Sequence, residues 1–178
     1  MANNINIVGV CSQNKIQNAI ACNCSTNTWT EFLLCEIVAL PIQNIDIESI
    51  IEIHSFVEII SQRVVKTPVV EGYTPPNGTP ILGQDVPNGE CTNLTGKKLV
   101  IEGLLKQKII YTALVNDQSL NTVNYITPFS TFIIIDSNTP INQSFKVTPY
   151  IESSNACNLG ERNIYKTTSI FISVVKSY

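Results

Sequence analysis

The residues between Lys98 and Tyr111 alternate between two kinds, and this alternation constrains the fold more than any other feature of the chain. The apolar kind occupies Leu99, Ile101, Leu105, Ile109 and Tyr111, and the charged kind occupies Lys98, Glu102, Lys106 and Lys108. Successive side chains of a β-strand point to opposite faces, so a period of two predicts a long strand with one face in a core and the other in water. Gly103 falls within the apolar row, and we expect the strand to bend or bulge there.

The residue composition also favours strands. Of the 178 residues, 57 are Ile, Val or Thr, whereas Ala occurs only six times. β-branched side chains lose rotamer freedom in a helix and pack well on a pleated sheet. A chain of this length forms one domain, or one domain with an arm.

Further strands are predicted on both sides of residues 98–111. Ile51, Ile53, Val57 and Ile59 form a second row that we expect in the core, with Glu52, His54 and Glu58 on the opposite face. Apolar segments predict strands at 29–40, 121–126, 129–135, 145–152 and 164–176, with a break at Pro128 and loops over 69–96 and 153–160. The fold class that this pattern predicts is all-β, an antiparallel β-sandwich or a barrel-like domain.

Two phenylalanines follow Pro128 closely. Phe129 and Phe132 are three positions apart, so they point to opposite faces of a strand. We expect at least one of the two to lie in the core.

The first 28 residues differ from the rest of the chain. Small, polar and amide side chains dominate residues 1–28, and only Ile5–Val10 resembles a short strand. We therefore divide the chain into an N-terminal arm, residues 1–28, and a β domain, residues 29–178. The arm contains too little apolar surface to offset the conformational entropy that it would lose on folding alone. We therefore expect something outside the body of the chain (the β domain, residues 29–178), a neighbouring subunit, to bind the arm.

Several motifs of the body resemble one known family. The resemblance is to the SPOCS domain, a β-rich module of spore-forming Firmicutes, and it covers about residues 45–176. The segments that carry it, in chain order, are Ile45–Pro68, Lys97–Gly103, Lys108–Ala113, Pro128–Ile133, Pro149–Glu152 and Glu161–Lys166.

The resemblance implies a protein of the spore coat or another outer spore layer, made in the mother cell. Some relatives dock onto the scaffold ATPase of the coat, and many carry a LysM module that binds glycan. We find no such module in this sequence and do not expect glycan binding by that route. The family supplies no catalytic residues.

The six cysteines are the strongest chemical feature. They are Cys11, Cys22, Cys24, Cys35, Cys91 and Cys157. Four thiols can hold zinc, but zinc sites use pairs separated by two to four residues, and Cys22 and Cys24 are separated by one. A buried, inert thiol is the alternative for Cys35, which lies in an apolar segment. We favour disulfides, partly between subunits, because a spore coat meets oxidising surroundings once the mother cell lyses.

No motif points to an enzyme, and we expect none. His54 is the only histidine, and beside Glu52 and Glu58 we interpret it as a surface residue rather than a base or a weak site for a divalent ion. The chain has no phosphate-binding glycine motif, and we expect no cofactor. Its net charge of −3 argues against a nucleic-acid partner.

The chain also has no apolar stretch long enough to cross a membrane as a helix. Residues 1–13 have neither a cationic start nor a long apolar segment, so we expect no signal peptide. We therefore expect synthesis in the mother-cell cytoplasm and a final location on the spore surface.

Two functional hypotheses remain open. The first is a structural subunit of a spore coat or surface appendage that forms a homo-oligomer or polymer, in which the arm adds to the sheet edge of a neighbour and disulfides lock the contact. The alternative is an adaptor that binds a coat scaffold protein without polymerising. Both make other spore coat proteins further partners.

Overall fold

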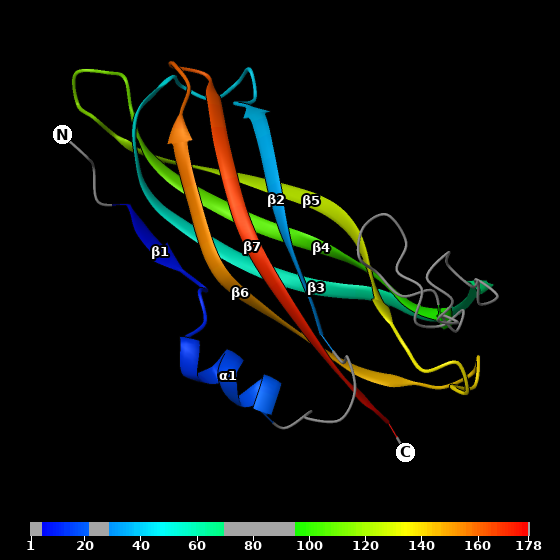
Figure 1. Ribbon diagram of the computed structural model, residues 1–178. Coiled ribbons are helices and arrows are strands. Elements are labelled where there is room, and N and C mark those ends of the chain that lie inside the picture. Colours follow the sequence, from blue (N-terminus) through cyan, green and yellow to red (C-terminus); the bar gives the residue numbers. More distant parts are fainter. Residues whose placement is uncertain (1–4, 22–28, 70–94, 178) are drawn as a thin grey trace, which may run out of the picture.

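The computed structural model describes residues 5–21, 29–69 and 95–177, and it shows two β-sheets packed face to face (Figure 1). One sheet has the strand order β1-β3-β4-β5 and the other β2-β7-β6. The expected all-β sandwich is confirmed, and the sheets do not close into a barrel. The elements are β1 (Asn6–Val8), α1 (Gln13–Ala21), β2 (Trp29–Ala39), β3 (Ile47–Val69), β4 (Thr95–Ala113), β5 (Leu120–Ile134), β6 (Phe145–Asn158) and β7 (Asn163–Lys176).

Strand β4 lies at the centre of its sheet and confirms the alternating pattern. Leu99, Ile101, Leu105, Ile109 and Tyr111 are all fully buried. At Gly103 a Cβ atom would lie 2.5 Å from the Phe129 ring and 2.7 Å from the Glu58 carbonyl oxygen, so glycine allows a close approach there. The register of β3 also shifts opposite this glycine, between Ile59 and Ser61.

Strand β3 corrects one predicted core residue. Ile53 and Val57 are buried and Ile59 packs against the core, but Ile51 is 41% exposed. The pairing of β3 with β4 shifts between Ile50 and Glu52, and this irregularity turns Ile50 inward in place of Ile51. A simple period of two cannot anticipate a bulge, since one extra residue reverses the faces.

Two predicted strand ends are also wrong. Strand β5 runs through Pro128, which pairs with Leu104, instead of breaking there. An edge strand tolerates proline, because half of its N–H groups have no partner strand. Strand β6 extends to Asn158, so Cys157 lies in a strand and not in the expected loop. The phenylalanine prediction is confirmed, since Phe129 is 8% exposed and Phe132 39%.

The interior consists of two apolar clusters separated by a layer of polar side chains. One cluster includes Leu99, Leu105 and Phe129, and the other includes Ile53, Ile109 and Ile164. All six long strands contribute to the layer between them, which we call the polar belt: Glu36, Ser55, Gln107, Thr127, Ser154, Lys166 and Thr168.

Lys166 is the centre of the polar belt and is only 2% exposed. Its ammonium group lies 2.5 Å from Glu36 Oε2, 2.9 Å from Gln107 Oε1 and 2.9 Å from Thr127 Oγ1. All three ammonium protons therefore have an acceptor. A buried ammonium is costly unless it is paired and hydrogen-bonded, and this arrangement meets both conditions.

Gln107 carries the belt across to the other strands. Its amide nitrogen donates to Ser55 Oγ and to Thr168 Oγ1, each at 3.1 Å, while its carbonyl oxygen accepts from Lys166. Ser154 Oγ lies within hydrogen-bond distance of Ser55 and Thr168. A slip of any strand by two residues would place an apolar side chain opposite these polar groups, so the belt fixes the register of both sheets.

Glu36 makes this network sensitive to pH. Burial acts to raise the pKa of Glu36, but the hydrogen bonds from Lys166 and Thr127 outweigh it and bring the pKa below the ordinary value of 4.5. The lowered pKa belongs to the folded state. The stabilisation by Glu36 is therefore complete above pH 4.5 and is lost as the pH falls through the folded-state pKa.

Glu36→Gln should lower the free energy of unfolding at pH 6.5 by about 1–3 kcal/mol, because charged hydrogen bonds contribute roughly that much and Glu36 is partly exposed. Urea unfolding at pH 6.5 and pH 3 measures the difference. The difference should be smaller at pH 3, because a larger fraction of the parent loses the Glu36 charge as the pH falls toward the lowered folded-state pKa. An equal difference at both pH values would show that the Glu36 charge has no such role.

Candidate functional site

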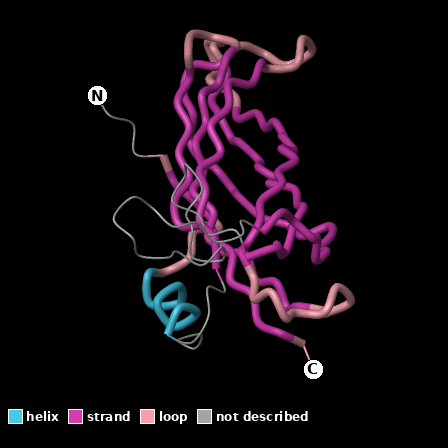
Figure 2. The backbone as a smooth tube through the Cα atoms, turned by 45° about the vertical axis from the view of Figure 1, so that its right-hand side comes forward, coloured by secondary structure: helices cyan, strands magenta, loops and turns pink. Residues whose placement is uncertain are grey.

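The arm closes the open side of the sandwich between β3 and β6 (Figures 1 and 2). Strand β1 pairs in parallel with β3, and Val8 lies opposite His54. Two residues later, Val10 bridges to Ile151 of β6, and the Cys11 amide donates to the Ile151 carbonyl oxygen at 2.8 Å. A six-residue segment, 6–11, thus joins one sheet to the other.

Gly9 makes this crossing possible. Its φ of +102° is a conformation that residues with side chains rarely adopt. A Cβ atom at this position would also overlap the Ser55 carbonyl oxygen of β3. Gly9 therefore turns the chain from β3 toward β6 directly over the polar belt.

The contacts that hold the arm are few. All three β1 residues are exposed, and the Asn6 amide donates to Glu52 Oε1 at 2.6 Å on the surface. Among residues 5–21 of the arm, only Ile5 packs against a core cluster. The sequence indicated the short strand, but not the helix α1, which lies against β7.

The receiver of the arm also differs from the prediction. We expected a neighbouring subunit to receive the arm, whereas in this single chain its own β3 and β6 do so. A parallel pairing between an arm and a strand some 45 residues away leaves no pattern in the sequence.

Six cysteines were predicted to form disulfides. Three of them lie in the part of the chain that the structure describes, and all three are free thiols. Cys11 is half-buried where the arm reaches β6, whereas Cys35 on β2 and Cys157 on β6 are exposed. The exposure of Cys35 argues against the buried, inert alternative. Cys22, Cys24 and Cys91 lie outside the described residues. Within residues 5–21, 29–69 and 95–177, no three metal-ligating side chains gather.

Cys35 and Cys157 share the outer face of the β2-β7-β6 sheet. Tyr165 of β7 lies between them, opposite Ile37 on one side and Cys157 on the other. The pKa of Tyr165 is raised, first by its hydrogen bond with Cys35 and further by the nearby charge that the two thiols can carry. Elsewhere on this sheet, Glu152 raises the pKa of Glu31, mainly by repulsion between the two carboxylates.

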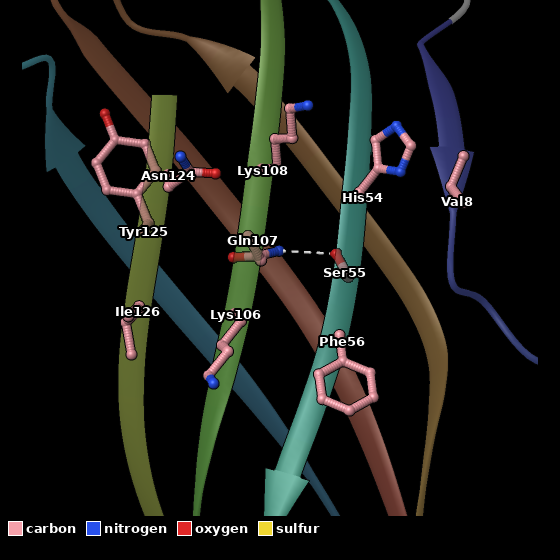
Figure 3. Close-up of a pocket in the computed structure, with 10 residues that line it drawn as sticks. All are labelled: Val8, His54, Ser55, Phe56, Lys106, Gln107, Lys108, Asn124, Tyr125 and Ile126. Carbon is pink, nitrogen blue, oxygen red and sulfur yellow. Dashed lines mark hydrogen bonds between the residues drawn. The ribbon is translucent and has the colours of Figure 1, made fainter. Parts of the chain in front are cut away.

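His54 lies beside a shallow groove on the outer face of the other sheet (Figure 3). The groove has a volume of about 530 Å³ and is lined by Val8, Phe56, Lys106, Lys108 and Ile126 among others. His54 Nε2 lies 3.4 Å from Glu52, while Glu58 pairs with Lys106 at 2.6 Å. The side chains of His54, Glu52 and Glu58 are therefore not brought together around one point.

Comparison with known families assigns the chain to a class. The sequence model described as SipL, SPOCS domain, matches residues 46–158, which include β3, β4, β5 and β6. The chain belongs to the SPOCS-domain family, and this membership connects it to the spore and its coat. The match is shorter than the expected 45–176 and does not include the arm, β2 or β7.

No curated protein and no solved structure matched this chain. Among the helices of the described residues, none is long and apolar enough to cross a membrane.

Gly9→Ala should detach the arm from its seat without unfolding the body, because the new Cβ has no space against Ser55. Hydrogen exchange measured by mass spectrometry should show faster exchange for residues 5–11 and unchanged exchange for β4. Gly160→Ala is the matched control, since Gly160 also has a positive φ but an added Cβ atom would meet nothing within 4 Å. Undiminished protection of residues 5–11 in Gly9→Ala would contradict the docking described here.

Proposed function

We propose that this protein is a structural subunit of the spore coat or of a spore-surface appendage. Its copies associate through the N-terminal arm, and disulfide cross-links then lock the contact. Synthesis in the mother cell precedes assembly, and lysis of that cell supplies the oxidising conditions. The proposal includes no catalytic activity.

The observation that supports this proposal is the docking of the arm on β3 and β6. Within residues 5–21, backbone contacts consist of a three-residue ladder, one bridge and one further hydrogen bond. The Asn6–Glu52 hydrogen bond, the packing of Ile5 and the contact of α1 with β7 add to them. Every copy presents the same β3 and β6 edges, so the arm of a neighbour can make identical contacts. Exchange of an identical element between protomers is a low-cost route to assembly.

The connection between arm and body suits such an exchange. Residues 22–28 join α1 to β2, and seven residues span at most about 24 Å when extended. An arm that docks on the next copy leaves its own seat vacant for a third copy. A head-to-tail contact of this kind produces rings or filaments.

A second candidate function is that of a coat adaptor, and the groove of Figure 3 favours it. Phe56 and Ile126 are largely exposed there, and they flank Lys106. A partly apolar groove with cations at its centre suits an acidic, amphipathic segment of a scaffold protein. In this hypothesis the arm stays on its own body.

Deletion of residues 1–24 separates the two functions. If the arm mediates assembly, the deleted protein kept under reducing conditions should remain soluble and monomeric in light scattering and electron microscopy, while the full chain forms large particles. Ser in place of Cys11, Cys22 and Cys24 should leave assembly intact but make the contact through the arm dissociate in denaturant. Equal assembly with and without the arm would exclude the arm mechanism.

A further inference from the structure

The outer face of the β2-β7-β6 sheet is divided into a covered and an open part. In the covered part, Phe171 is 1% exposed beneath the rings of Trp29 and Tyr150. In the open part, Leu33 and Ile37 of β2 are 60% and 66% exposed. We call the open part the thiol face, and it consists of Leu33, Cys35, Ile37, Cys157, Tyr165 and Thr167.

The two thiols of this face cannot pair with each other. Cys35 lies opposite Thr167, and Cys157 lies opposite Tyr165, so they occupy opposite ends of a diagonal across β7. Two strand spacings and a two-residue offset place their Cα atoms about 12 Å apart. A disulfide needs Cα atoms within about 7 Å, so it cannot form between them without rearrangement of the sheet.

Cys11 in its seat is also too far away. Its amide bonds to Ile151, and Cys157 lies six residues further along β6, a separation of roughly 20 Å. Both exposed thiols therefore need a partner from outside the folded body described here.

We propose that a second copy of this chain covers the thiol face and that Cys35 of each copy forms a disulfide with Cys157 of the other. A two-fold axis in the plane of the contact, crossing the diagonal between the thiols, exchanges their positions. One such axis therefore produces two identical bonds. Stacked sheets can be joined in this way, as the disulfide of immunoglobulin domains shows.

The chemistry of the face favours an identical partner. None of its six residues is charged, so two copies meet without repulsion even though the chain carries a net charge of −3. Leu33 and Ile37 supply apolar surface that a flat, uncharged partner covers. The proposal rests on the proposed function as a self-associating subunit, but it uses a surface separate from the arm seat.

The size of the face explains why covalent bonds are needed. A strip five residues long and three strands wide measures about 17 by 14 Å, or roughly 240 Å². Stable interfaces bury about 800 Å² on each partner. Contact through the thiol face alone is therefore weak and reversible until the disulfides form.

Each bond requires an oxidant, for which a small disulfide such as oxidised glutathione suffices. The Cys35 thiolate attacks it, forms a mixed disulfide and releases one glutathione thiolate. The thiolate of Cys157 of the second copy then attacks the Cys35 sulfur and releases the second glutathione. Two protein thiols lose two protons and two electrons, and one glutathione disulfide becomes two thiols.

A full-length variant that keeps only these two thiols tests the proposal, with Cys11, Cys22, Cys24 and Cys91 replaced by Ser. After oxidation by glutathione disulfide, a non-reducing denaturing gel should show a dimer, and peptide mass spectrometry should find the Cys35–Cys157 link in it. Addition of Gly9→Ala should leave the dimer yield unchanged, which separates this contact from the arm mechanism.

The matched control adds Leu33→Lys and Ile37→Lys to the same two-thiol variant. These changes keep both thiols but place like charges on the two faces, so the dimer yield should fall at least tenfold. An oxidised protein that stays monomeric would overturn the proposal. So would a dimer whose yield is unaffected by the two lysines, or one in which the Cys35–Cys157 link is no more frequent than links between identical cysteines.

Discussion

The ammonium group of Lys166 holds this sandwich in register. It lies between the sheets and meets Glu36 of β2, Gln107 of β4 and Thr127 of β5, and Gln107 extends the network to β3 and β6. Apolar side chains fill the space on either side, but a slip by two residues would still turn apolar side chains inward there. The buried charge of Lys166 does not tolerate such a slip, because any shift of its strand removes its hydrogen-bond acceptors. The position of both sheet edges therefore depends on this layer.

This dependence explains how the arm can be a separate, exchangeable element. The long strands make the belt and both core clusters, and β1 contributes to neither. Apart from Ile5, which packs against one core cluster, and α1, which lies against β7, the described part of the arm contacts the edges that the belt has already aligned, above Ser55 and at Ile151. An element that the core does not need can leave its own body and dock on another at small cost, which is what assembly through an arm requires.

The sequence predicted the central strand well because each of its core residues follows a strict period of two. It failed at Ile51, where a bulge reverses the faces, and at Pro128, where an edge position makes a proline harmless. The polar belt left a visible signal, since Ser55 and Gln107 interrupt two apolar rows at inward positions. The seat of the arm left none, because it depends on backbone pairing between distant segments. The candidate thiols were found by residue type alone. Only the structure shows that Cys11 lies where the arm meets β6, whereas Cys35 and Cys157 lie on one outer face.

The pairing of Val8 with His54 allows the most direct test of arm exchange. One variant carries Val8→Cys and another carries His54→Cys, both with the six native cysteines replaced by Ser. We predict that the two, mixed under assembly conditions and oxidised, form a disulfide between position 8 of one chain and position 54 of another. A third variant with both changes establishes that the pair can close within a chain. If that variant closes its link and the mixture forms none, the arm stays on its own body and the account is wrong.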